Sequence, residues 1–199
     1  MLRTPFLLLP ILAPITAGCS GTRRTEPSRT ATEQLLISAA VDHALDGLDL
    51  GIPQGTKLWV DARYFESIDR DYAVGAIRNH LLREGGRLVN GRAEADAVVE
   101  IRSGALSTDR NEMFVGIPSV DLPIPLVENA STPELGILKK NDETGVAKIG
   151  MTIYEMKTGA LAPYSPAAPA YGFSDRTRWV VLSLISWTNT DVMPEDVEK

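Results

Sequence analysis

An apolar stretch at the N-terminus of this 199-residue chain stops just before its only cysteine, Cys19. One positive charge, Arg3, precedes the apolar residues from Pro5 to Ala17, which is the order of regions in an export signal. The stretch is shorter than the ~20 apolar residues that span a bilayer. Because Cys19 has no cysteine partner, neither a disulfide nor a thiolate metal site can form within one chain. The remaining chain suits a single domain that buries its own core.

The residues around this cysteine, Ile15-Thr16-Ala17-Gly18-Cys19, resemble the lipobox of bacterial lipoproteins, although that family most often has Leu in place of Thr16. The resemblance implies cleavage between Gly18 and Cys19 and lipidation of Cys19 with acyl chains such as palmitate. The alternative is a general export signal whose small-residue cleavage site happens to contain a cysteine. In such lipoproteins an Asp after the cysteine retains the protein in the inner membrane. Ser20 therefore implies a bacterial cell-envelope protein held at the outer membrane and facing the periplasm.

Composition agrees with a soluble domain behind this signal. Hydrophobic residues make up 44% of the chain and charged residues 23%. The formal net charge of −6 argues against nucleic acid as a partner, because phosphate binding needs clustered Lys and Arg. We expect a signal peptide at residues 1–18, a lipidated tether at 19–31, a single domain at 32–187 and a flexible tail at 188–199.

Apolar periodicity predicts two helices. The first begins at Thr30-x-x-Glu33, which has capping-box spacing, and the second begins at Ser67 or Asp69 and ends at Gly85-Gly86. Short strands are predicted at residues 57–61, 87–89, 94–104, 146–155 and 178–187. The last segment is apolar on both faces, which fits a central strand or a buried helix, and its Val, Ile and Trp residues favour the strand. This order predicts an α+β fold in which two helices pack on one face of a mixed four- to five-stranded sheet.

Residues 107–145 interrupt the strand pattern and predict a long Pro-rich loop. The loop is also apolar, and five of its residues are candidates for partner contact: Phe114, Ile117, Leu122, Ile124 and Leu126. If they are exposed, they form a patch of the kind that marks a contact with a partner or a membrane. The equally weighted alternative is a loop that covers the protein's own sheet.

Several blocks resemble an uncharacterised family of bacterial lipoproteins, a domain of unknown function. The blocks are residues 28–36, 59–61, 76–78, 94–100, 116–118 and 133–135. This resemblance implies an envelope location and no particular chemistry. A looser similarity, carried by residues 85–89 and 95–99, is to periplasmic α+β modules of lipoproteins that assist envelope assembly.

Catalytic and metal-binding patterns are weak. His43 and His80 are isolated in predicted helices, so we expect no metal site, no cofactor and no catalytic residue. Asp61 ends a predicted strand, where pocket residues often lie in α/β proteins. Asp61 and nearby Tyr64 are therefore candidates for a pocket.

These features predict a non-enzymatic lipoprotein, anchored to the membrane through Cys19, that binds a partner (an envelope protein or a second copy of itself) or supports envelope assembly. The alternative is a small-molecule-binding protein or a hydrolase at the envelope, acting through Asp61 and Tyr64.

Overall fold

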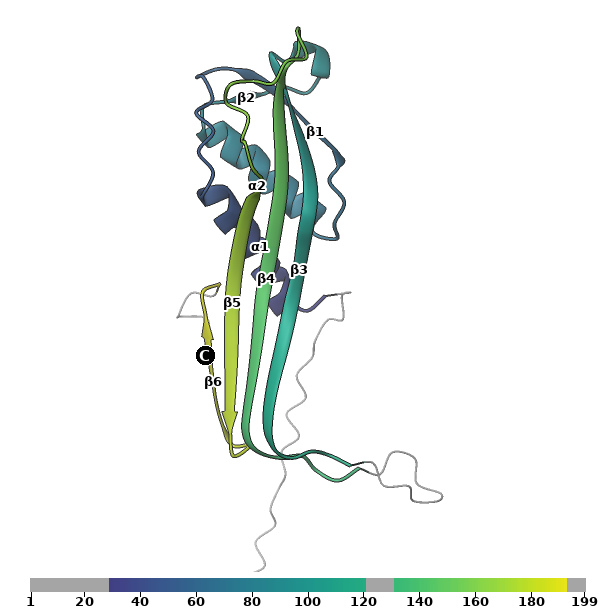
Figure 1. The fold of residues 1–199 in the computed structure, drawn as a ribbon, viewed down its shortest axis with the longest axis vertical. Coiled ribbons are helices and arrows are strands. Elements are labelled where there is room, and N and C mark those ends of the chain that lie inside the picture. The colour runs from purple at the N-terminus through teal and green to yellow at the C-terminus, as the bar shows by residue number, and fades with distance from the viewer. Residues whose placement is uncertain (1–28, 121–130, 193–199) are drawn as a thin grey trace, which may run out of the picture.

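The computed structural model describes residues 29–120 and 131–192 of the chain (Figure 1). In chain order the elements are α1 (Ala31–Asp46), β1 (Lys57–Tyr64), α2 (Arg70–Arg83), β2 (Arg87–Leu88), a 3-10 turn (Arg92–Glu94), β3 (Ala97–Ile117), β4 (Leu135–Glu155), β5 (Ala170–Val181) and β6 (Ile185–Thr190). The strands form one sheet in the order β2-β1-β3-β4-β5-β6. Strand β1 pairs in parallel with β2 and β3, and the other pairs are antiparallel.

The α+β class, the two helices and the mixed sheet are confirmed, but the predicted number of strands is wrong. The sheet has six strands instead of four or five. The extra strand comes from the predicted segment 178–187, which the structure divides between the end of β5 and the start of β6. Strand β6 continues to Thr190, inside the segment predicted as a tail.

Helix α1 begins as its sequence predicts. The Thr30 hydroxyl accepts a hydrogen bond from the Glu33 N–H, and the Glu33 carboxylate accepts one from the Thr30 N–H. One face of the helix is fully buried, through Leu36, Ile37, Ala40, Val41, Ala44 and Leu45. Two glycines in the sheet let the helix backbone come close, because a Cβ on Gly145 would meet the Leu36 carbonyl and one on Gly172 would meet the Ala40 carbonyl. Beside Gly145, the buried Ser174 hydroxyl donates to the Leu36 carbonyl at 2.6 Å.

Helix α2 packs beside α1 on the same side of the sheet, behind the strands in Figure 1. Its buried residues Ala73, Ile77 and Leu81 join one core cluster with α1 and with alternate residues of the sheet, such as Val99, Ile101 and Ile153. No helix within the described ranges is long and apolar enough to cross a membrane.

The long Pro-rich loop predicted at residues 107–145 is mostly strand. Strand β3 continues to Ile117 and β4 starts at Leu135, so each is 21 residues long and they pair along their whole length. The prediction was wrong because residues 108–112 and 139–143 are polar on both faces, which hides the two-residue periodicity. There the two strands are joined by the hydrogen bonds of their ladder and by pairs of opposite charge across it.

Candidate functional site

Strands β3 to β6 extend well past the helices and form a free antiparallel ribbon (Figure 1). We call this part the β-ribbon and define it as residues 107–117 of β3, 135–144 of β4, 175–181 of β5 and 185–190 of β6. The level of Gly145 and Ser174, where the Leu36 carbonyl touches the sheet, marks its start. Register places the residues of the four strands in rows, so the character of each face can be read across the β-ribbon.

The face that continues from the helix-covered side is charged. Glu143 lies between two arginines, at 3.8 Å from the Arg110 side chain and 3.1 Å from that of Arg176. Further toward the end of the ribbon, the Lys139 ammonium lies 2.9 Å from the Glu112 carboxylate. This hydrogen bond lowers the pKa of the Glu112 carboxyl. These cross-strand pairs hold the ribbon together without a covering layer.

The opposite face of the β-ribbon is apolar toward its end. One row consists of Met113, Lys140, Trp179 and Trp187, and the next consists of Val115, Leu138, Val181 and Ile185. The rings of Trp179 and Trp187 stack with centroids 6.2 Å apart, and the Lys140 ammonium lies 5.3 Å from the Trp179 ring. The single lysine therefore covers an aromatic ring and leaves the surface around it apolar.

A tight turn closes the end of the ribbon between β5 and β6. Leu182 and Ser183 have φ of 51° and 55°, the left-handed region that a type I′ turn requires at both central residues, and the Leu184 N–H donates to the Val181 carbonyl at 3.1 Å. The Ser183 hydroxyl accepts from the Gly136 N–H and donates to the Gly136 carbonyl, at 3.2 Å each, which ties the turn to β4. Leu184 follows with 86% of its surface exposed.

Half of the large exposed hydrophobic residues in the described ranges gather at this end. We call the group the apolar end, and its members are Met113, Val115, Ile117, Leu135, Ile137, Leu182, Leu184, Ile185 and Trp187. A surface of this kind on a soluble domain marks a contact site. The apolar end is the strongest candidate for a functional site among the described residues.

Two of the predicted contact residues lie in this region and three lie outside the described residues. Ile117 is exposed and belongs to the apolar end. Phe114 is half-buried on the charged face, with the Lys139 ammonium 5.9 Å from its ring. Leu122, Ile124 and Leu126 fall in residues 121–130, and the lipidation and cleavage residues Gly18 and Cys19 fall in 1–28, all outside the described ranges.

The sequence prediction missed the β5–β6 side of the site. Residues 178–187 are apolar on both faces, a pattern that favours one continuous strand and hides the break before Ile185 and Trp187. The turn that exposes them contains neither Gly nor Asn, so no turn signal was available.

Asp61 and Tyr64 both contact Arg63. The Asp61 side chain has no exposed surface and accepts three hydrogen bonds of 2.7 to 3.0 Å from the Arg63 side chain. Those hydrogen bonds lower the pKa of the Asp61 carboxyl. The Arg63 guanidinium also lies 5.6 Å from the Tyr64 ring. Tyr64 lines an open groove of about 590 Å³, but Asp61 is not among the residues that line it.

Asp61 therefore makes a testable contribution to stability. We expect Asp61→Asn to lower the free energy of unfolding by about 1–2 kcal/mol at pH 7, the low part of the range for hydrogen bonds to charged groups, because Arg63 is exposed to water. Since the pKa is lowered from 3.8 in the folded state, the contribution is complete above that value and is lost as the pH falls through the folded pKa. Urea unfolding at pH 7 and pH 3 measures this, and a difference between wild type and variant that stays constant with pH contradicts it.

The groove between α1 and α2 is lined by several titratable side chains, among them Asp42, Tyr72 and His80. The Tyr72 hydroxyl donates to the Asp42 carboxylate at 2.7 Å, and burial together with this carboxylate raises the pKa of Tyr72 to about 12. Asp46 and His80 line the same groove, whereas His43 contacts the Phe173 carbonyl through Nδ1 at 2.6 Å. Within the described ranges, no three His, Cys, Asp or Glu side chains lie close enough together to hold a metal ion.

Comparison with known proteins identifies a family and no activity. No curated protein matches the chain. The profile of one family, described as a family of unknown function (DUF6655), matches residues 16–181, which cover both helices and most of the sheet. This result agrees with the uncharacterised family expected from the sequence blocks. The protein therefore belongs to the family of unknown function DUF6655.

Proposed function

We propose that the protein is a non-enzymatic envelope lipoprotein, anchored through Cys19, that supports envelope assembly by binding a partner at its apolar end. The observation that carries this proposal is the gathering of exposed hydrophobic residues at the end of the β-ribbon. The apolar end consists of aliphatic side chains, Met113 and Trp187, whose ring stacks on that of Trp179, so its chemistry is that of an interface. The alternative of a small-ligand site has less support, because the buried Asp61 does not line the groove beside Tyr64.

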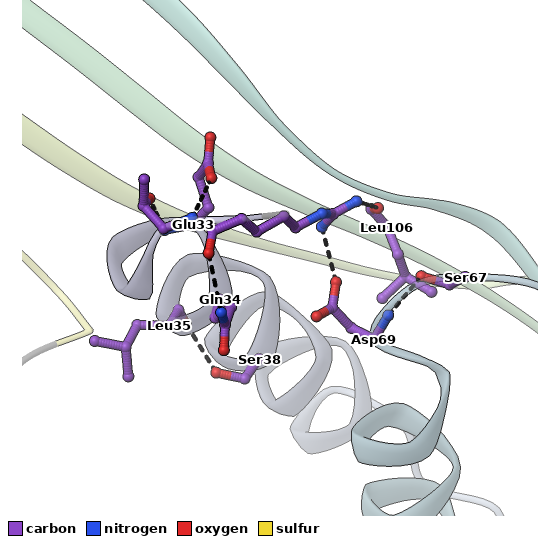
Figure 2. A network of polar contacts seen from close by, with 9 residues as sticks. Glu33, Gln34, Leu35, Ser38, Ser67, Asp69 and Leu106 are labelled. Atoms are coloured by element: carbon purple, nitrogen blue, oxygen red, sulfur yellow. Dashed lines mark hydrogen bonds and ion pairs between the residues drawn. The ribbon is translucent and has the colours of Figure 1, made fainter. Parts of the chain in front are cut away.

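The start of the domain is fixed at the base of the β-ribbon, as Figure 2 shows. The Arg29 guanidinium donates to the Asp69 carboxylate at 2.7 Å and to the Leu106 carbonyl at 3.5 Å, which joins the two helix starts to β3. The Arg29 carbonyl accepts from the Gln34 side chain at 3.1 Å. Arg29, the first described residue, therefore lies next to Leu106.

The position of Arg29 supports a contact of the apolar end near the membrane. Cys19 precedes Arg29 by ten residues, and ten extended residues span at most about 33–36 Å. From Leu106 to Ile117, β3 runs about 36 Å at the ~3.3 Å rise of a strand. A lipid on Cys19 and the apolar end can therefore reach the same bilayer surface, which supports a partner of the apolar end at that membrane. Ser20 favours the outer membrane, on its periplasmic side.

The test is chemical cross-linking of tagged protein in native envelopes, with the double variant Ile185→Ser/Trp187→Ser. We expect at least about a tenfold loss of cross-linked complexes, because truncation of apolar anchors at an interface typically costs ~2 kcal/mol or more. The matched control is Leu161→Ser/Tyr171→Ser, which changes two residues of similar exposure away from the apolar end. The proposal is wrong if both double variants retain wild-type levels of complexes while thermal unfolding shows that they remain folded.

A further inference from the structure

The β-ribbon has two open edges. Strand β1 pairs with β3 only as far as Arg102, so the outer edge of β3 from Ser103 to Ile117 has no strand partner among the described residues. On the other side, β6 pairs with β5 and likewise has no second strand beside it in the described ranges. Unpaired N–H and C=O groups along such an edge are ready to pair with another strand.

The two edges are complementary in direction. Each of the pairs β3–β4, β4–β5 and β5–β6 is antiparallel, so β3 and β6 run in opposite directions. If a second copy lies beside the first in the same orientation, its β6 meets β3 as an antiparallel strand. Both edges are then used once by each copy, which is a head-to-tail contact.

The side chains along the two edges are complementary as well. Asn111, Met113 and Val115 share rows with Asn189, Trp187 and Ile185, respectively, on the same face of the sheet. In a second copy at the same level, Trp187 and Ile185 lie next to Met113 and Val115, and the apolar face continues across the junction. On the charged face, Arg110 and Glu112 meet Thr190 and Thr188, so no like charges oppose each other.

We infer that the partner is a second copy of this chain, joined edge to edge through β3 of one copy and β6 of the next. This inference rests on the proposed function, because it assigns an occupant to the apolar end. Register follows from the faces, since a shift by one residue would place Trp187 on the charged side. Shifts by two residues keep the faces matched. Asn189 of one copy therefore pairs with Asn111 of the next copy, or with Asp109 or Met113 in the neighbouring rows.

Disulfide cross-linking of the full chain in native membranes tests the contact. The variant Asn111→Cys/Asn189→Cys places two thiols on the same face, separated by two intervening strands, or about 14 Å at the ~4.8 Å spacing of a sheet. That distance is too long for a disulfide within one molecule. Mild oxidation should give a ladder of covalent dimers and larger species. Asp109→Cys/Asn189→Cys and Met113→Cys/Asn189→Cys cover the neighbouring rows.

Single variants decide between the possible arrangements. Asn111→Cys and Asn189→Cys alone should stay monomeric on denaturing gels, because a head-to-tail contact brings each edge against the other. Wild-type protein controls for Cys19, and Lys157→Cys/Asn189→Cys controls for random collision of exposed thiols. Dimers from a single variant would mean that like edges meet and would overturn the inference. Monomer from all three double variants would also overturn it, whereas the proposed function would stand if the cross-linked complexes then contain a different protein.

Discussion

Replacing Gly172 by alanine is expected to lower the free energy of unfolding by about 3 kcal/mol, the upper part of the range for overpacking a core. A Cβ at this position would overlap the Ala40 carbonyl and lie 2.5 Å from the Ala44 backbone nitrogen. Both atoms belong to the backbone of α1, which cannot rotate away as a side chain can. The helix must therefore move off β5, against which it makes its largest contact with the sheet.

Thermal unfolding measures this effect, and the expected decrease in Tm is roughly 6–12 °C for a domain of this size. Gly75→Ala is the matched control, because a Cβ there meets no atom within 4 Å. It lies within α2 and should raise the free energy of unfolding by about 0.5–1 kcal/mol through helix propensity. Equal Tm values for Gly172→Ala and wild type would contradict the close packing of α1 on β5.

Replacing Cys19 by serine is expected to transfer almost all of the protein from the membrane fraction to the soluble fraction. The proposed acyl chains each contribute ~0.8 kcal/mol per buried methylene, so their loss removes the anchor. A hydroxyl cannot replace the thiol, because the lipid is attached to these proteins through a thioether. The domain itself should be unaffected, since Cys19 precedes the fixed start at Arg29 by ten residues.

Fractionation after a high-salt wash and labelling with a palmitate analogue together measure this result. Ser20→Ala, which leaves the cysteine in place, should keep both the membrane association and the label. Membrane association of Cys19→Ser that equals that of the wild type, or wild-type protein without label, would contradict lipid anchoring.

The covered half of the fold could be predicted from the sequence, because local signals and burial agree there. The capping box at Thr30 and Glu33 marks the first helix start, and the apolar period of residues 37–45 marks its buried face. Alternation around Val99 and Ile101 identifies the side of β3 that meets the helices. In these segments the apolar period coincides with the face that packs into the core, so the period is sufficient to predict the element and its buried side.

The β-ribbon could not be predicted, because its stability does not come from apolar burial. Arg110, Glu143 and Arg176 are far apart in sequence and meet only across three strands. The candidate site could not be predicted for the same reason, since Met113 and Trp187 are far apart in sequence and are brought into one row by register alone. Of the predicted contact residues, Ile117 is exposed at the end of β3. The β6 half of the apolar end depends on a turn at Leu182 and Ser183 that lacks the usual turn residues.

Site-specific photo-cross-linking in native envelopes is the most direct test of the apolar end as the contact surface. A photoreactive amino acid at Leu184, 86% exposed, is compared with the same residue at Leu161, 67% exposed and away from the β-ribbon. Our account predicts a discrete protein cross-link from position 184 and none from position 161. A discrete product from position 161 with none from position 184 would contradict the account and would place the contact surface elsewhere on the domain.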